Sequence, residues 1–278
     1  MSLTVAVLGA SGVYGRHLAP RLLARGHRVR ALVRRADSAP AGASAYVADI
    51  FDGESLRRAL DGCDVVINLA TSVPRPDQPP DFAMNDRIRR AGTATLIAAC
   101  QGGQRLIQQG IAMVHAGGGE TMLDEQSPMS VGPTTASAIE MEAMVRNSGL
   151  SHLILRGGLF YGPGTGREAH WLAAARDGSL AVPGDGSSFA SLIHVADMAE
   201  ATAMAVEASA ASGAFLVVDD GPVRWRDLFS HVAKRAAAPE PRTGAPLRLP
   251  SFRCSNAAAR AALGWRPFYA DYRAGLAA

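Results

Sequence analysis

The chain of 278 residues is 48% hydrophobic and has a formal net charge of +3 at pH 7, so it can form a sizeable core and is not a disordered chain. Its positive charge comes from scattered arginines and only 6% of it is aromatic, which argues against a nucleic-acid partner. The three cysteines, Cys63, Cys100 and Cys254, fit neither a disulfide framework nor a zinc site. With no signal sequence and no apolar run long enough for a bilayer, we expect a cytoplasmic protein without a membrane or metal partner.

Strand and helix patterns alternate along the first ~155 residues, which is typical of a parallel sheet with helices on both faces. In chain order, the pattern predicts strands at 3–8, 28–33, 45–48, 64–68, 105–109 and 153–155, and helices at 12–25, 54–60, 82–99 and 136–147. The long loop 115–135 is rich in Gly, Pro and Ser, and its residues 116–135 are a candidate lid. We therefore predict an α/β fold of the Rossmann type, a doubly wound parallel sheet. Residues 1–155 form approximately its dinucleotide-binding core, and 156–278 mainly a smaller C-terminal substrate lobe.

A glycine-rich turn follows the first predicted strand and opens the first helix. Gly9 permits the tight turn, Gly12 lets the backbone approach phosphates, and Gly15 lets the helix and the strand pack closely. The helix N-terminus offers unpaired N–H groups to a pyrophosphate. The sequence therefore predicts a dinucleotide site formed by this turn, with the contacts Gly9, Ser11, Gly12, Val13, Tyr14 and Gly15.

Two arginines, Arg34 and Arg35, stand at the end of the second predicted strand. An NAD site usually has an acidic residue there, which binds the ribose hydroxyls. A guanidinium suits a 2′-phosphate instead, through bidentate, charge-assisted hydrogen bonds. We therefore predict NADPH as the cofactor, with Arg34 the better candidate, while the alternative is that both arginines are solvated surface charges.

The chain resembles the extended short-chain dehydrogenase/reductase superfamily, which includes nucleotide-sugar epimerases. The resemblance lies in the glycine turn and in five later segments that follow it in the family's order, which are 48–50, 63–70, 154–164, 193–197 and 263–267. The resemblance implies that residue 49 contacts the adenine, that residues near 69 lie beside the cofactor ribose, and that 154–164 passes the nicotinamide. The further cofactor contacts that it implies are Asp49, Ile50, Leu69, Ala70, Thr71, Gly110, Gly158 and Leu159.

The chain departs from the catalytic pattern of this superfamily, which uses a Tyr and a Lys four residues later on the helix after the fifth strand. Aligned on Ser137 and Glu142, the tyrosine position holds Thr134 and the lysine position holds Ala138. The position of the family's Ser or Thr falls at Gly110 or Ile111. The only tyrosines are at 14, 46, 161, 269 and 272, and the only lysine is at 234, so the pair is absent in any register.

Hydride transfer does not itself need this tyrosine, because the cofactor carries the hydride. The missing function is proton donation, which is typically worth ~10²–10⁴-fold in rate. His115 and His170 are the alternative proton donors, and Thr134 is a candidate for a positioning role. A third possibility is that a ketone beside a phenolic hydroxyl supplies its own proton, which would leave the protein without a catalytic acid.

Ile111, Met113, Phe160 and Trp171 lie in segments that the resemblance places near the nicotinamide, which favours an aromatic small-molecule substrate. Atypical family members without the tyrosine–lysine pair include actinobacterial ketoreductases of aromatic polyketides such as angucyclinones. We therefore predict an NADPH-dependent ketoreductase of antibiotic biosynthesis that acts on an aromatic polyketide-like ketone. The alternatives are a dyad-less C=C or quinone reductase, an NADP-sensing regulator without catalysis, and an epimerase or dehydratase. A monomer and a homodimer are both open.

Overall fold

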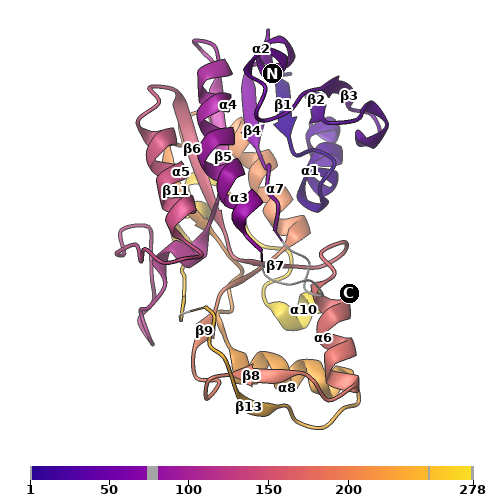
Figure 1. The fold of residues 1–278 in the computed structure, drawn as a ribbon, viewed down its shortest axis with the longest axis vertical. Coiled ribbons are helices and arrows are strands. Elements are labelled where there is room, and N and C mark those ends of the chain that lie inside the picture. Colours follow the sequence, from indigo (N-terminus) through magenta and orange to yellow (C-terminus); the bar gives the residue numbers. More distant parts are fainter. Residues whose placement is uncertain (1, 74–80, 250, 277–278) are drawn as a thin grey trace.

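The computed structural model describes residues 2–73, 81–249 and 251–276. Its centre is a seven-stranded sheet with the strand order β11-β6-β5-β4-β1-β2-β3 (Figure 1). All its strand pairs are parallel, which confirms the predicted Rossmann-type α/β fold. The strands are β1 (Thr4–Leu8), β2 (Arg28–Val33), β3 (Ser44–Val47), β4 (Val65–Asn68), β5 (Arg105–Ile111), β6 (Ser151–Gly157) and β11 (Gly213–Val217).

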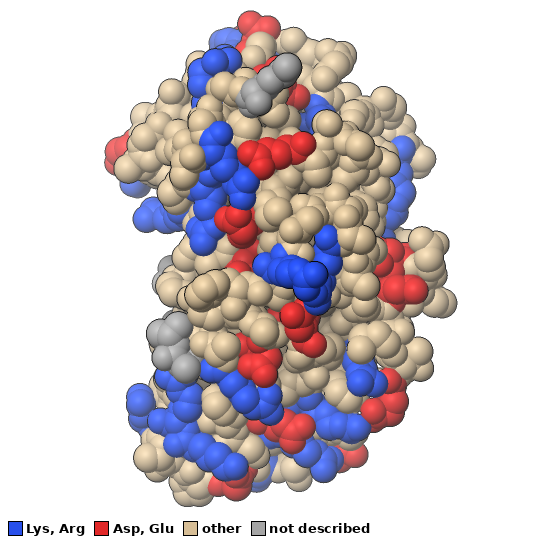
Figure 2. All heavy atoms as spheres, turned by 180° about the vertical axis from the view of Figure 1, so that it is seen from behind, with Lys and Arg blue, Asp and Glu red and all other residues tan. Residues whose placement is uncertain are grey.

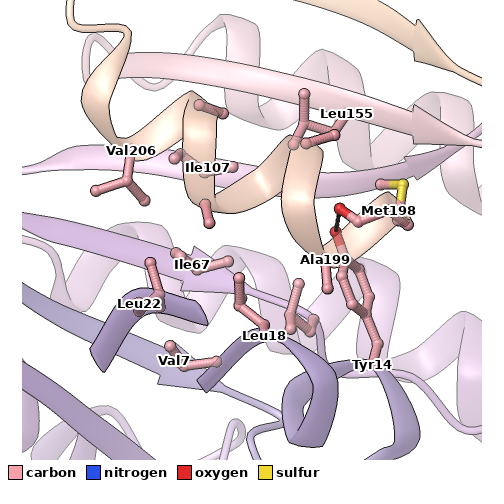
Figure 3. Close-up of a cluster of buried hydrophobic side chains, with 14 of the residues drawn as sticks. Val7, Tyr14, Leu18, Leu22, Ile67, Ile107, Leu155, Met198, Ala199 and Val206 are labelled. Carbon is pink, nitrogen blue, oxygen red and sulfur yellow. Dashed lines mark hydrogen bonds between the residues drawn. The ribbon is translucent and has the colours of Figure 1, made fainter. Parts of the chain in front are cut away.

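Helices cover both faces of this sheet because each carries one apolar side. One face packs against α1 (Val13–Ala24) and α7 (Val195–Glu207). In Figure 3, Leu18 and Leu22 of α1 lie on one side of this core and Val206 of α7 on the other. The opposite face of the sheet packs against α2 (Gly53–Leu60), α4 (Thr93–Ala99) and α5 (Ala136–Arg146).

The predicted helix 82–99 is divided into three pieces, α3 (Ala83–Arg87), a π-helical turn η2 (Ile88–Gly92), and α4. The π turn lies where the chain packs tightly on its neighbours, since a Cβ at Gly92 would lie 2.8 Å from the Ile50 side chain. Such turns insert one extra residue into a helix and often occur at functional sites. Here η2 contains Arg89, a buried cation that the periodicity of the segment did not single out.

The sheet takes its seventh strand and one covering helix, β11 and α7, from beyond residue 155, the approximate end of the core in the sequence analysis. The remaining C-terminal elements surround a separate apolar core in the lower half of Figure 1. They are β7 (Leu159–Tyr161), α6 (Arg167–Arg176), β8 (Ala181–Pro183), β9 (Phe189–Ala190), β10 (Leu192–His194), β12 (Val223–Arg224), α8 (Trp225–Arg235), β13 (Arg242–Ala245) and α10 (Tyr272–Leu276). Helix α9 (Ala257–Leu263) instead packs on the core of the sheet, through Ala259 and Leu263.

Two short 3₁₀ turns, η1 (Ala36–Ser38) and η3 (Ala112–His115), follow β2 and β5. Among the described residues, no helix has the length and apolar character needed to cross a bilayer. Basic and acidic side chains are interspersed on the face seen in Figure 2, with uncharged surface between them.

Candidate active site

A cavity of about 1100 Å³ lies between the carboxyl ends of the central strands and the C-terminal lobe. This edge of a doubly wound sheet is where such folds bind ligands, at the point where the strand order reverses. Its walls come from the β1–α1 turn, the ends of β4, β5 and β6, helix α3 with η2, and α6. The lining includes Gly9, Gly12, Val13, Tyr14, Leu69, Thr71, Gly110, Ile111, Met113, Gly158, Leu159 and Phe160, all predicted from the sequence as cofactor or substrate contacts.

The glycine turn has the geometry that a pyrophosphate needs. Gly9 has φ +83°, and a Cβ there would lie 2.9 Å from the Leu69 carbonyl carbon. A Cβ at Gly15 would lie 2.5 Å from the Ala10 backbone, so helix and strand meet closely at this residue. The first turn of α1 has no side-chain cap, which leaves its N–H groups free to bind an anion. These residues therefore fit a dinucleotide phosphate.

The predicted adenosine contacts lie outside the main cavity. Arg34 and Arg35 are exposed at the carboxyl end of β2, next to β1 in the sheet. Arg35 pairs with Asp37, at 3.1 Å between Nε and Oδ1. Asp49 accepts a hydrogen bond from the Phe51 backbone at 2.9 Å. Of the predicted cofactor residues, those that do not line the cavity are Ser11, Gly15, Arg34, Arg35, Asp49, Ile50 and Ala70.

Three closely packed glycines, Gly110, Gly157 and Gly158, line the cavity near the ends of β5 and β6. A Cβ at Gly158 would lie 2.7 Å from the Ser191 carbonyl oxygen, and one at Gly157 would lie 2.6 Å from the Phe160 ring. A Cβ at Gly110 would meet the Glu142 carboxylate at 2.9 Å. A side chain at any of these positions would therefore displace a packed neighbour, and all three glycines line the cavity.

The prediction that Trp171 contacts the substrate is corrected, because this residue does not line the cavity. It is 5% exposed and packs on Phe229 of α8, with ring centroids 5.8 Å apart. Arg167, His170 and Ala173 line the cavity from α6, since residues three apart share one face of a helix. Trp171 points about 100° away from His170, into the core of the lobe.

His115 is also corrected, since it is buried and does not line the cavity. Arg156 Nη1 lies 2.5 Å from His115 Nε2, and His115 Nδ1 donates to the Pro128 carbonyl oxygen at 3.3 Å. Arg156 also pairs with the fully buried Glu142 at 2.7 Å. Burial and the neighbouring Arg156 lower the pKa of His115. His115 therefore belongs to a buried network with Arg156 and Glu142, away from the described lining.

The other two candidates for the proton-donating step, His170 and Thr134, line the cavity and are exposed. The role of His170 as a proton donor and the positioning role of Thr134 stay predictions. Tyr14 is the one tyrosine among the described lining residues, and no lysine lies among them. Its hydroxyl bonds to Thr202 and to the Met198 carbonyl (Figure 3), and burial raises its pKa well above 10. The hydroxyl of Tyr14 therefore joins α1 to α7, and the predicted cofactor contact of this residue stays a prediction.

The loop 116–135 contributes only Thr134 to the cavity lining. Backbone hydrogen bonds hold its first half on the C-terminal segment, from Gly117 N to Ser251 O at 2.8 Å and from Leu123 N to Arg253 O at 2.7 Å. Glu125 accepts a further bond from the Leu216 backbone. These contacts fix the loop to the lobe, so the structure does not support the candidate lid.

The sequence analysis missed a polar group on the cavity wall. Arg89, which is 8% exposed, donates from Nη1 to Ser137 Oγ at 3.1 Å, and Ser137 donates to Asp86 Oδ1 at 2.6 Å. Burial lowers the pKa of Arg89 and Asp86 opposes this effect. Arg89 and Asp86 both line the cavity. The sequence showed an arginine on the helix that faces α5, but no local pattern indicated the direction of its side chain.

Fold and cavity together define a dinucleotide-binding protein with the architecture of an extended short-chain dehydrogenase/reductase. The chain belongs to the NAD dependent epimerase/dehydratase family, which matches residues 5–218. This confirms the superfamily that the sequence motifs resemble.

Curated relatives that cover most of the chain are named as reductases. A 3-diazoavenalumate denitrifying reductase from Streptomyces sp is 38% identical over 300 residues, 98% of each chain. A 4-hydroxy-2-methyl-3-oxo-4-farnesyl-3,4-dihydroquinoline-1-oxide ketoreductase from Stigmatella aurantiaca is 27% identical over 238 residues, 81% of this chain and 70% of the relative. The class supported is therefore an oxidoreductase of this superfamily.

Solved structures share the fold over nearly the whole chain. UDP-glucose 4-epimerase from Thermus thermophilus, in complex with NAD, has a TM-score of 0.80 at 24% identity and covers 99% of this chain and 96% of its own. A dTDP-glucose 4,6-dehydratase from Streptomyces venezuelae has a TM-score of 0.83 at 20% identity and covers 99% and 95%. At these identities the likeness shows the fold alone.

Proposed function

We propose that the protein is an NADPH-dependent reductase that acts on an aromatic substrate whose reduction needs no proton from the protein. The observation that carries this proposal is the composition of the cavity. It joins a glycine turn suited to a dinucleotide to an apolar wall that includes Ile111, Met113 and Phe160. Its described lining has no lysine, and the hydroxyl of its one tyrosine, Tyr14, is hydrogen-bonded to Thr202 of α7.

When bound, NADPH supplies a hydride. The β1–α1 turn would hold its pyrophosphate, and Arg34 would bind its 2′-phosphate from the end of β2. Gly110, Gly157 and Gly158 line the part of the cavity where the nicotinamide ring would lie. The apolar wall would limit water around the reacting atoms, and Arg89 would stabilise an anionic oxygen of the substrate.

The acceptor that we favour is an aromatic diazo group beside a ring oxygen. The ring carbon gains the hydride and its bond to nitrogen breaks. The electron pair of that bond leaves with dinitrogen, and a phenolate remains on the neighbouring carbon. No alkoxide forms at the reacting carbon, so the absence of the family's tyrosine and lysine does not slow this reaction. The full-length relative named as a 3-diazoavenalumate denitrifying reductase supports this choice.

An aromatic ketone is the second candidate acceptor, favoured by the relative named as a ketoreductase. Here the carbonyl carbon gains the hydride and the oxygen becomes an alkoxide that needs a proton. A phenolic hydroxyl next to the carbonyl, as in an aromatic polyketide, transfers that proton within the substrate. Thr134 would hold the carbonyl by a hydrogen bond, since an alcohol is a poor acid at neutral pH.

The test supplies purified protein with NADPH deuterated at the transferred position and with three substrates. These are an ortho-diazoquinone, an ortho-hydroxyaryl ketone, and the same ketone with its hydroxyl methylated. We expect NADPH consumption, dinitrogen release and one deuterium on the ring carbon with the diazo substrate. Deuterium on the carbinol carbon, with the free hydroxyl only, would select the ketone.

Equal turnover of the hydroxy and methoxy ketones would contradict substrate-supplied protonation and return the proton to the protein, with His170 the first residue to replace. Bound NADPH without turnover of any of the three would contradict the reductase and favour the NADP-sensing regulator.

A further inference from the structure

The described lining of the cavity includes two arginines, Arg89 and Arg167, whose charges are balanced differently. Arg89 reaches the carboxylate of Asp86 through the hydroxyl of Ser137. Arg167 has no comparable partner, because none of the ion pairs among the described residues includes it. Among the described lining residues, Arg167 is therefore the cation without a counter-ion.

The guanidinium of Arg167 is held from one side only. Its Nε donates to the Phe160 carbonyl oxygen at 2.8 Å, and its Cζ lies 5.7 Å from the centre of the Trp171 ring. Its two terminal nitrogens make no hydrogen bond to a described residue, and neither is sealed from the cavity. The edge of the guanidinium formed by Nη1 and Nη2 is therefore held in place, but its two parallel donors have no hydrogen-bond partner among the described residues.

This arrangement is unfavourable without a ligand. Burial lowers the pKa of Arg167 to about 10, and no charge among the described residues opposes this shift. A partly buried cation without a partner loses hydration and gains no attraction in return. A carboxylate matches the planar pair of donors and would form two charge-assisted hydrogen bonds. Arg167 is also the first residue of α6, where the helix dipole favours an anion.

The position of Arg167 assigns this anion to the substrate. Helix α6 belongs to the C-terminal lobe, whereas the dinucleotide phosphates have their own N–H groups at the β1–α1 turn. The apolar side chains of Leu159, Phe160 and Leu249 line the same cavity and suit an aromatic ring. Resting on the reductase function proposed above, we infer that Arg167 binds a carboxylate of the substrate, which is therefore an aromatic acid.

The test measures binding, so that it does not depend on turnover. The probes are 4-hydroxycinnamate and its methyl ester, titrated by calorimetry into protein saturated with NADP⁺. We expect the acid to bind ~10–100-fold more tightly than the ester, because hydrogen bonds to charged groups contribute ~1.5–3 kcal/mol. Arg167→Gln should abolish this preference and Arg167→Lys should retain part of it. Arg176→Gln is the matched control, an exposed arginine at the other end of α6 outside the cavity.

Equal affinity of the acid and the ester for the wild-type protein would overturn the inference, whatever the stability of the variants. An unchanged preference in Arg167→Gln would also overturn it. If Arg167→Gln weakens NADP⁺ binding and leaves the preference intact, the guanidinium binds the cofactor and the inference is wrong. Failure of the proposed function is separate, because a protein that prefers the acid but oxidises no NADPH keeps the carboxylate site and loses the reductase.

Discussion

The buried ion pair between Glu142 of α5 and Arg156 of β6 allows a sharp test of the packing behind the cavity. Both side chains are at most 2% exposed and lie 2.7 Å apart. Glu142→Ala leaves the guanidinium of Arg156 buried without a full counter-charge, which we expect to cost ~3–5 kcal/mol in the free energy of unfolding. In a domain of this size each kcal/mol corresponds to ~2–4 °C, so Tm should fall by roughly 6–20 °C.

The assay is thermal unfolding followed by circular dichroism, with Glu140→Ala as the matched control. Glu140 lies on the same helix and also pairs with an arginine, Arg90, but these side chains are 52% and 45% exposed. Exposed pairs contribute ~0–1 kcal/mol, so the control should unfold within a few degrees of the wild type. The double variant Glu142→Met with Arg156→Met should recover much of the loss, because an apolar pair leaves no buried charge.

Equal Tm values for Glu142→Ala and Glu140→Ala would refute this reasoning. They would mean that water or a local rearrangement solvates Arg156, and that the network around it does not hold the floor of the cavity. His115 would then again be available as a candidate acid.

Four further predictions concern the cofactor, the reaction and pH. Arg34→Ala should raise KM for NADPH far more than for NADH, and more than Arg35→Ala does, since Arg35 is paired with Asp37; equal effects on both cofactors would exclude a 2′-phosphate contact. Thr134→Val should be nearly silent in kcat, and a loss beyond ~100-fold would show that its hydroxyl is essential. Arg89→Gln should lower kcat by ~10–100-fold with little change in NADPH affinity, whereas the exposed Arg90→Gln should change neither. Burial raises the pKa of Asp219 from 3.8 to about 8, so the contribution of its protonated form to stability is lost as pH rises from about 4 through 8. The free energy of unfolding of Asp219→Asn should therefore exceed that of the wild type by several kcal/mol at pH 9 and be similar to it at pH 4. Parallel pH profiles of the two proteins in denaturant unfolding would contradict this.

The local features of the site could be predicted from the sequence because their residues are close together in the chain. The strand, the turn at Gly9, Gly12 and Gly15, and the helix form one continuous segment, so the spacing alone specifies the phosphate-binding geometry. The alternation of strands and helices likewise determines the parallel sheet. The absence of a tyrosine and a lysine from the helix at 136–147 needed no structure, since the chain has only one lysine.

The tertiary structure decided which side chains face the cavity, because that depends on what each helix packs against. Contact between α6 and α8 buries Trp171 and leaves Arg167 and His170 at the cavity. Arg156, which pairs with Glu142 between α5 and β6, holds His115 in the interior and outside the described cavity lining. The π turn before α4 brings Arg89 to Ser137, across 48 residues of sequence. A motif specifies the backbone that it contains, but a cavity wall is assembled from distant segments, so its charges became visible only when the chain was folded.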